Sequence, residues 1–86
     1  MYKVYVPYSE RLDRYYVGST QDLDDRMTRH NAGRSKYTKS GVPWQLVTSF
    51  DFENRSDAVK MENKIKKRGI KRFFDDNNIR GIAQSG

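Results

Sequence analysis

Two short segments near the start of the chain alternate in a way that favours an antiparallel sheet. Residues 2–8 place a tyrosine or a valine at every second position, and residues 13–18 again mix aromatic and β-branched side chains. The polar segment 9–12 between them is short enough for a hairpin turn. We therefore predict two antiparallel strands, and we expect Tyr8 to lie opposite Asp13 across the hairpin.

This register gives the hairpin two different faces, because residues that lie opposite each other point to the same side of a sheet. The first face is suited to a core and carries Val4, Val6, Tyr15 and Val17. The second face is polar and aromatic, and it carries Lys3, Tyr5, Arg14, Tyr16 and Gly18. Only 35% of the residues are apolar, so aromatic side chains must supply much of the buried surface.

The next part of the chain predicts a helix, a loop and a third strand. Thr20 or Asp22 can cap a first helix that ends near Asn31, and acidic residues in its first turn suit the helix dipole. A polar, basic loop over residues 34–43 follows. The third strand is expected over residues 44–50, where aromatic and β-branched side chains return.

The last part of the chain predicts two more helices. Ser56 is expected to cap a helix over residues 57–68, which a glycine ends. A short third helix is expected over 70–76, and residues 81–86 suit a flexible C-terminal tail. The element order is therefore β-β-α-β-α-α, an α+β arrangement that forms a single domain over residues 1–80.

The composition limits both the chemistry and the cellular setting. The chain contains no cysteine, which excludes disulfides and cysteine-ligated metals. It has no apolar run long enough to span a membrane, and its polar N-terminal strand is unlike a signal peptide. We expect a cytoplasmic protein that does not bind membranes, and a monomer rather than an oligomer.

Basic residues are concentrated in one stretch of this chain, whose net charge is +6. Residues 60–72 contain seven lysines and arginines and a single acid, Glu62. Such a cluster is typical of a surface that binds a polyanion such as nucleic acid. A solvated helix face explains a basic run equally well, so that alternative stays open.

Three polar side chains fall on helix faces that should point inward. Arg26 and His30 share one face of the first helix, and Glu62 lies on the apolar stripe of the second. A buried carboxylate is costly unless a cation, a metal or water lies beside it. The simplest alternative to a functional site is a structural salt bridge between Arg26 and Glu62. In the same way, His30 could be an ordinary buried histidine, and Tyr5 and Tyr16 could be packing partners.

Taken together, these residues resemble the motifs of the GIY-YIG endonuclease superfamily over roughly residues 2–75. In chain order the matching motifs are Lys3-Val4-Tyr5, Tyr16-Val17-Gly18, Asp22-Leu23, Arg26, His30-Asn31 with Gly33, Lys36-Tyr37-Thr38, Pro43-Trp44-Gln45-Leu46-Val47, and the helix with Ala58, Glu62, Ile65 and Lys66. Gly18 is the motif glycine, whereas the first motif has Lys3 and Val4 in place of its glycine and isoleucine. Some relatives carry a lysine at the place of Ser19 and an asparagine in the final helix, which Asn77 or Asn78 could supply.

The resemblance implies a three-stranded antiparallel sheet flanked by helices, and a metal-dependent DNA endonuclease. It implies that Glu62 holds one Mg²⁺ or Mn²⁺ ion, that Arg26 stabilises the phosphate charge, and that Tyr5 is the general base. Tyr16 would orient the water or the phosphate, and His30 could relay the proton. Contacts to the DNA backbone are expected from Lys36, Tyr37, Lys39, Lys66, Lys67 and Lys71.

Three other functions fit parts of the sequence. A domain of this fold could bind nucleic acid without cleaving it, and a basic structural domain could bind ribosomal RNA. A nuclease of another type would use Glu62-Asn63-Lys64 with Asp51 or Glu53, although Lys64 would point away from Glu62 on a helix. RNA also stays open as the substrate in place of DNA.

Overall fold

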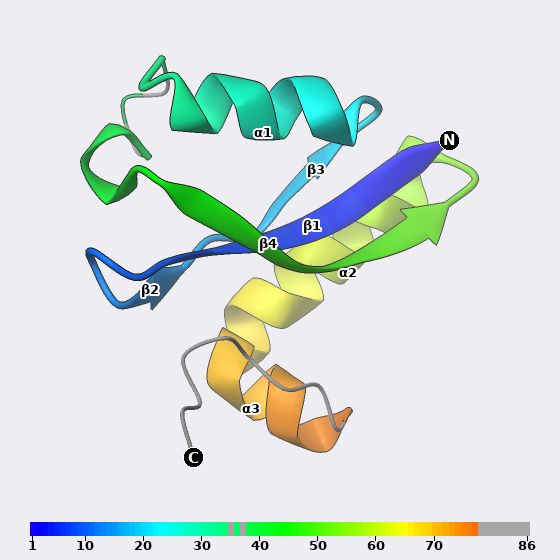
Figure 1. Ribbon diagram of the computed structural model, residues 1–86. Helices are drawn as coiled ribbons and strands as arrows, with labels where there is room; N and C mark the ends of the chain where they lie inside the picture. The colour runs from blue at the N-terminus through cyan, green and yellow to red at the C-terminus, as the bar shows by residue number, and fades with distance from the viewer. Residues whose placement is uncertain (35, 37, 78–86) are drawn as a thin grey trace.

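The computed structural model describes residues 1–34, 36 and 38–77, and it shows a small sheet between helices (Figure 1). Its elements are β1 (Tyr2–Ser9), β2 (Arg14–Tyr15), β3 (Gly18–Thr20), α1 (Leu23–Asn31), the 3-10 helix η1 (Lys39–Gly41), β4 (Trp44–Phe52), α2 (Arg55–Arg68) and α3 (Ile70–Asp76). The expected α+β fold and order of elements are confirmed, with the second strand divided into β2 and β3. Tyr37, Asn78 and the expected tail over 81–86 lie outside the described residues. The helices of the described part are all too short or too polar to cross a membrane.

The strand β1 lies at the centre of the sheet. β4 pairs with β1 along its whole length, from Tyr2 opposite Phe52 to Ser9 opposite Trp44. β2 and β3 both pair antiparallel with the other edge of β1. Between them the Tyr16 N–H donates to the Pro7 carbonyl at 2.9 Å, so the two form one interrupted strand. The sheet is therefore three-stranded and antiparallel, as expected.

The predicted hairpin register is wrong by two residues. Tyr8 lies opposite Tyr15 rather than Asp13. Asp13 belongs to the turn instead, where it has a positive φ of 50° and its carboxylate accepts the Tyr8 hydroxyl at 2.6 Å. Side chains alternate with a period of two along a strand, so a slip of two residues leaves every side chain on its predicted face.

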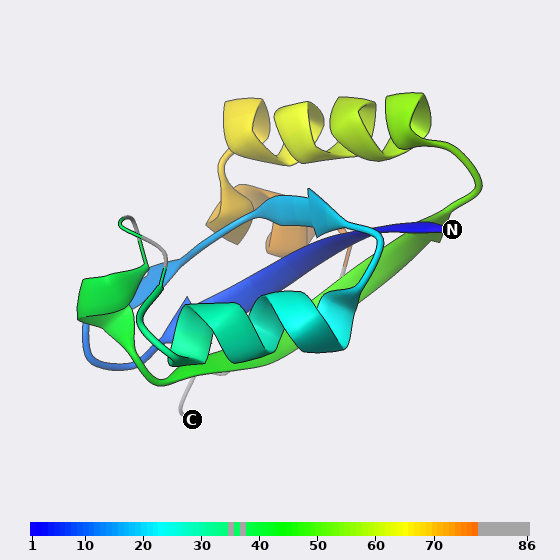
Figure 2. The same ribbon diagram turned by 90° about the horizontal axis from the view of Figure 1, so that it is seen from above.

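The two faces of the sheet are covered by different helices, as the view from above shows (Figure 2). α2 lies against one face and α1 against the other. The buried core on the α2 side consists of Val4, Val6, Val17, Ala58, Ile65, Phe73 and Phe74. Burial of each large apolar side chain in such a core contributes about 1.5–3 kcal/mol. The face that carries Tyr5 is left for α1, and it becomes the polar side of the molecule's interior.

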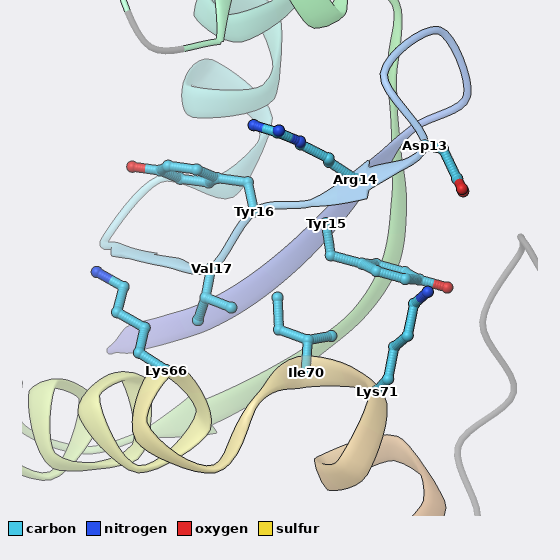
Figure 3. Close-up of a pocket in the computed structure, with 8 residues that line it drawn as sticks. All are labelled: Asp13, Arg14, Tyr15, Tyr16, Val17, Lys66, Ile70 and Lys71. Carbon is cyan, nitrogen blue, oxygen red and sulfur yellow. The ribbon is translucent and has the colours of Figure 1, made fainter.

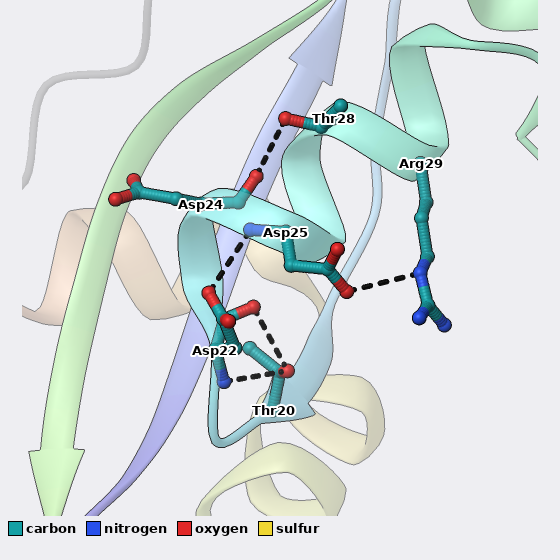
Figure 4. A network of polar contacts seen from close by, with 6 residues as sticks. All are labelled: Thr20, Asp22, Asp24, Asp25, Thr28 and Arg29. Carbon is teal, nitrogen blue, oxygen red and sulfur yellow. Dashed lines mark hydrogen bonds and ion pairs between the residues drawn. The ribbon is translucent and has the colours of Figure 1, made fainter.

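The N-terminus of α1 is fixed by a polar network (Figure 4). Asp22 is the N-cap, and its carboxylate accepts the Asp25 N–H at 3.0 Å. Thr20 closes the turn before the helix, since its hydroxyl oxygen accepts the Asp22 N–H at 3.1 Å. Arg29 lies one turn further on and pairs with Asp25 at 3.0 Å. Of the two predicted cap residues, Thr20 and Asp22, the N-cap is therefore Asp22, and the network around it fixes where α1 begins.

The predicted cap of α2 is wrong by two residues. Asn54, not Ser56, is the N-cap, and its side-chain oxygen accepts the Asp57 N–H at 2.9 Å. Ser56 lies inside the first turn, because the helix begins at Arg55. The predicted end of the helix is confirmed at Gly69, whose φ of 93° allows the chain to turn into α3.

Candidate active site

Tyr5 stands at the centre of the candidate site. It lies in the middle of β1 on the face covered by α1, and its side chain is completely buried. Its hydroxyl lies 2.7 Å from Nε2 of His30, near the end of α1. Two polar groups that the sequence placed on inward faces therefore meet in a hydrogen bond.

His30 is held from its other side by the loop before β4. Its Nδ1 lies 2.8 Å from the Thr38 hydroxyl, and Thr38 is itself buried. The Trp44 indole N–H donates to the Thr38 carbonyl at 2.7 Å, which fixes this loop against the sheet. Burial and the nearby Arg26 guanidinium lower the pKa of His30 below its usual range. His30 is therefore neutral near pH 7.

Tyr16 completes an aromatic cluster around the same point. Its ring centroid lies 6.3 Å from that of Tyr5 and 5.3 Å from that of His30, and the Tyr16 and His30 rings are in a T-shaped arrangement. Tyr16 falls in the gap between β2 and β3, so its side chain is half-buried where Tyr5 is fully covered. Tyr16 is thus the phenol of the pair that solvent can reach.

Gly18 is required by the packing of these two phenols. It pairs with Tyr5 across the sheet. A Cβ at Gly18 would lie 2.8 Å from the Tyr5 hydroxyl oxygen and 3.0 Å from a ring carbon of Tyr16. Contacts this short force neighbouring atoms to move, so the motif glycine makes room for the two tyrosine rings.

The charges of Arg26 and Glu62 both act on the Tyr5 hydroxyl. Burial, together with the nearby Tyr16 phenol, raises the pKa of Tyr5 above its usual value. The Arg26 guanidinium opposes this rise, and the Glu62 carboxylate adds slightly to it. The Tyr5 phenol is therefore protonated at neutral pH, and Arg26 and Glu62 lie near enough to its hydroxyl to influence it.

Glu62 approaches the site from the opposite layer. It lies on α2, and its carboxylate accepts the Ser19 hydroxyl of β3 at 2.9 Å. Its other oxygen pairs with the Lys66 ammonium at 2.6 Å, one turn along the helix. Among the described residues, the ion-pair partner of Glu62 is Lys66 rather than Arg26. The alternative of a structural Arg26–Glu62 salt bridge is therefore wrong.

The donor set at Glu62 fits one kind of metal site. The part of the chain that the structure describes contains no group of three or more histidine, cysteine or acidic side chains that could enclose a metal. Glu62 offers a single hard oxygen ligand, and its side chain is 17% exposed. Mg²⁺ commonly keeps several waters and binds one carboxylate together with a substrate phosphate. The residues present are thus compatible with that arrangement.

The predicted DNA-binding residues do not share one surface. Lys66 and Lys71 line a cavity beside Tyr16, whereas Lys67 lines a separate cavity on the other side of α2. Lys36 and Lys39 are exposed in the loop before β4. Their contacts with nucleic acid stay predictions.

The structure also separates other residues that the sequence had offered. Asn77 donates its side-chain N–H to the Phe73 carbonyl at 2.8 Å, so it ends α3 and lines the cavity with Lys67. Lys64 lies in that same cavity, and Asp51 pairs with Lys3 at 2.6 Å. The form of the alternative nuclease set that uses Asp51 with Glu62 and Lys64 is therefore not brought together, and the form that uses Glu53 stays untested.

Sequence reasoning missed two polar supports of the site. Ser19 had been noted only as the place of a missing lysine, yet it holds the Glu62 carboxylate. Thr38 lay within a matching motif, but the spacing of the motifs did not indicate that its hydroxyl would contact His30.

A polar cavity of about 430 Å³ adjoins Arg26, and Ser19, Arg29 and Arg55 also line it.

Comparisons with known proteins agree with this geometry. The family model described as the GIY-YIG catalytic domain matches residues 1–73. The UPF0213 protein YsiG of Lactococcus lactis is 46% identical over 48 residues, which cover 55% of this chain and 46% of that protein. The UPF0213 protein lwe0147 of Listeria welshimeri is 46% identical over 54 residues, covering 62% of this chain and 60% of that protein. The chain thus spans about half of the length of the curated relatives that it matches.

A solved structure of another UPF0213 protein has a similar fold. The solution structure of the UPF0213 protein BH0048 from Bacillus halodurans superimposes with a TM-score of 0.58 and 26% sequence identity. The superposition covers 96% of this chain and 89% of that one. The similarity therefore extends over nearly the whole of both proteins.

Proposed function

Since this chain belongs to the GIY-YIG catalytic domain family, a family of nucleases, we propose that it is a metal-dependent endonuclease that hydrolyses phosphodiester bonds of DNA. The UPF0213 relatives have names that state no reaction, so the chemistry of the site carries the proposal. The observation that supports it best is the hydrogen bond of Tyr5 to His30, at a hydroxyl on which the charges of Arg26 and, more weakly, Glu62 act.

The proton of the attacking water passes through Tyr5 to His30. The Tyr5 pKa is raised, so this residue does not act as a standing phenolate. Instead its hydroxyl oxygen takes a proton from water while its own proton moves to His30 Nε2, 2.7 Å away. Neutral His30 can accept that proton, and its Nδ1–H then donates to Thr38. As the new P–O bond forms, the bond to the leaving oxygen breaks and that oxygen is protonated by solvent.

Arg26 and Tyr16 hold the substrate for this attack. The forked donors of Arg26 suit a non-bridging phosphate oxygen, where they neutralise the charge that builds up in the transition state. Tyr16 is the reachable phenol and orients the phosphate or the water. Because Tyr5 is fully covered, the side chains over its hydroxyl must move before water can reach it.

A divalent metal held by Glu62 supplies charge stabilisation for the leaving oxygen. Ser19 keeps one carboxylate oxygen in place through its hydroxyl. Lys66 now pairs with the other oxygen at 2.6 Å. If a metal took that oxygen, Lys66 would be freed to contact the DNA backbone.

Closed circular DNA provides the direct test of endonuclease activity, because an exonuclease cannot open a circle. The protein would be incubated with single-stranded and supercoiled circles in Mg²⁺, in Mn²⁺ and in EDTA. Linear or nicked product in the metals, absent in EDTA, is the expected result. Binding of both circles without cleavage in either metal would instead support the alternative, a non-catalytic nucleic-acid-binding domain on a nuclease fold.

A further inference from the structure

The cavity that Lys66 and Lys71 line forms a hollow beside the candidate active site. It lies between the β2–β3 segment and the junction of α2 with α3 (Figure 3). Its volume is about 490 Å³. Val17 and Ile70 point toward each other at its centre. Tyr16 and Lys66 lie at one end of it, and the side chain of Lys71 reaches toward the other. The hollow therefore combines an apolar floor with cationic ends.

This hollow is continuous with the site that the proposed function uses. Lys66 lines it and also pairs with Glu62 at 2.6 Å. Tyr16 lines it and also packs against His30. A chain bound along the hollow would thus lead directly to the phosphate that Arg26 and Glu62 are placed to handle.

The charges of the hollow favour an anionic occupant. Arg14, Lys66 and Lys71 are the basic residues that line it, and Asp13 is the acid. The Asp13 carboxylate accepts the Tyr8 hydroxyl of β1 at 2.6 Å. Lys66 is paired with Glu62, so the positive charge offered to a ligand comes mainly from Arg14 and Lys71. The occupant is therefore expected to bring negative charge along with apolar surface.

A comparison with the polar cavity that adjoins Arg26 helps to identify the kind of ligand that would bind in the hollow. That cavity is lined mostly by polar side chains, three of them arginines and two of them aspartates, so it offers little apolar surface to a ligand. The hollow at Val17 and Ile70 has an apolar floor. The charged phosphates on the outside of a double helix gain no binding energy from such a surface. A base and sugar that have left the stack present apolar surface and remain tied to phosphates.

We propose that the hollow between Tyr16, Val17, Ile70 and Lys71 is a subsite for one unstacked nucleotide of a single-stranded DNA segment. This inference rests on the proposed function for its place beside the scissile phosphate, and it names the substrate class: DNA that is unpaired at that point. Val17 is only 3% exposed, so the base lies mainly on Ile70 and Tyr16, and Lys71 contacts the phosphate that follows it.

The test compares oligothymidylate with an abasic oligonucleotide of equal length, which has the same phosphates and no bases. Fluorescence anisotropy in EDTA measures binding without cleavage. We expect the abasic chain to bind about tenfold more weakly, as lost base contacts usually produce. Lys71→Ala should weaken binding of oligothymidylate several-fold. Arg11→Ala, which removes the same charge from the exposed hairpin turn, should leave it unchanged.

Backbone amide signals identify where the base binds. Oligothymidylate should shift the NMR signals of Val17 and Ile70, and the abasic chain should not. Equal affinity for the two chains, or shifts confined to Arg26, Arg29 and Arg55, would overturn the subsite. These experiments measure no cleavage, so the proposed function is tested separately. If the protein cleaves no DNA but its Val17 and Ile70 signals still shift, the subsite is supported and the nuclease activity is not.

Discussion

At the scale of single residues, the site depends on a buried hydrogen-bonded chain from Tyr5 through His30 to Thr38. Burial acts on its two titratable members in opposite directions, raising the pKa of the phenol and lowering that of the imidazole. Both shifts favour the neutral form. His30 is therefore neutral in the resting site and can accept the proton that Tyr5 gives up.

The roles of the two phenols can be separated by removing each hydroxyl. Tyr5→Phe should lower turnover by about 10²-fold or more with little change in DNA affinity, because it removes a general base. Tyr16→Phe should have the smaller effect on turnover and should weaken substrate binding. Single-turnover cleavage and anisotropy measure the two quantities. If Tyr16→Phe costs more turnover than Tyr5→Phe, Tyr16 is the base and the assignment is reversed.

The lowered pKa of His30 also predicts how stability depends on pH. The unfolded state binds a proton more readily than the native state, so this contribution is fully present above the unfolded pKa of about 6.5. It is lost as the pH falls through the lower folded value. His30 is the single histidine of the chain, so His30→Gln should remove this dependence. Thermal unfolding between pH 5 and pH 8 measures it, and identical pH slopes for the two proteins would contradict the prediction.

At the scale of elements, the helices are fixed by caps that sequence patterns locate only approximately. The interior of α1 and α2 follows from the spacing of apolar residues, and Gly69 marks the break before α3. The cap of α2 was misplaced, because both Asn54 and Ser56 are good cap residues and only the turn geometry chooses between them. The register was misplaced in the same way, since Asp13 was needed in the turn.

The assignment of the α2 cap can be measured directly. Asn54→Ala should lower the free energy of unfolding by about 1 kcal/mol, the usual cost of losing an N-cap side chain. Ser56→Ala, the matched control two residues on, should change it much less, since Ser56 lies inside the first turn. Urea denaturation would quantify both. Equal losses for the two variants would show that Asn54 contributes nothing particular as a cap.

Four lysines of α2 and α3 divide into two pairs that line different cavities. Lys66 and Lys71 lie beside Tyr16, and Lys64 and Lys67 lie beyond the helix. Replacing Lys66 and Lys71 together with alanine should weaken DNA binding more than replacing Lys64 and Lys67. It should reduce the slope of log K against log salt concentration by about 2. Anisotropy titrations over a range of salt concentrations would compare the pairs. Equal slopes would mean that the basic stretch acts only through its total charge.

At the scale of the whole molecule, the site is assembled from both layers around the short edge strand β3. Tyr5 and His30 belong to the α1 side, and Glu62 belongs to the α2 side, with Ser19 of β3 between them. The motif residues, the fold and the two faces of the hairpin could all be predicted from the sequence. The partner of Glu62 could not, because Arg26 and Lys66 were both available cations and only the path of α2 decides between them.

The central claim is that Glu62 makes this domain a metal-dependent nuclease, and one substitution tests it most directly. Glu62→Gln keeps the shape of the side chain and an oxygen for Ser19, but it removes the charge that a metal needs. DNA cleavage in Mg²⁺ would be compared for the two proteins, with anisotropy and thermal unfolding as controls. The variant should fold and bind DNA but no longer cleave it. Undiminished cleavage by Glu62→Gln would show that Glu62 does not hold the catalytic metal.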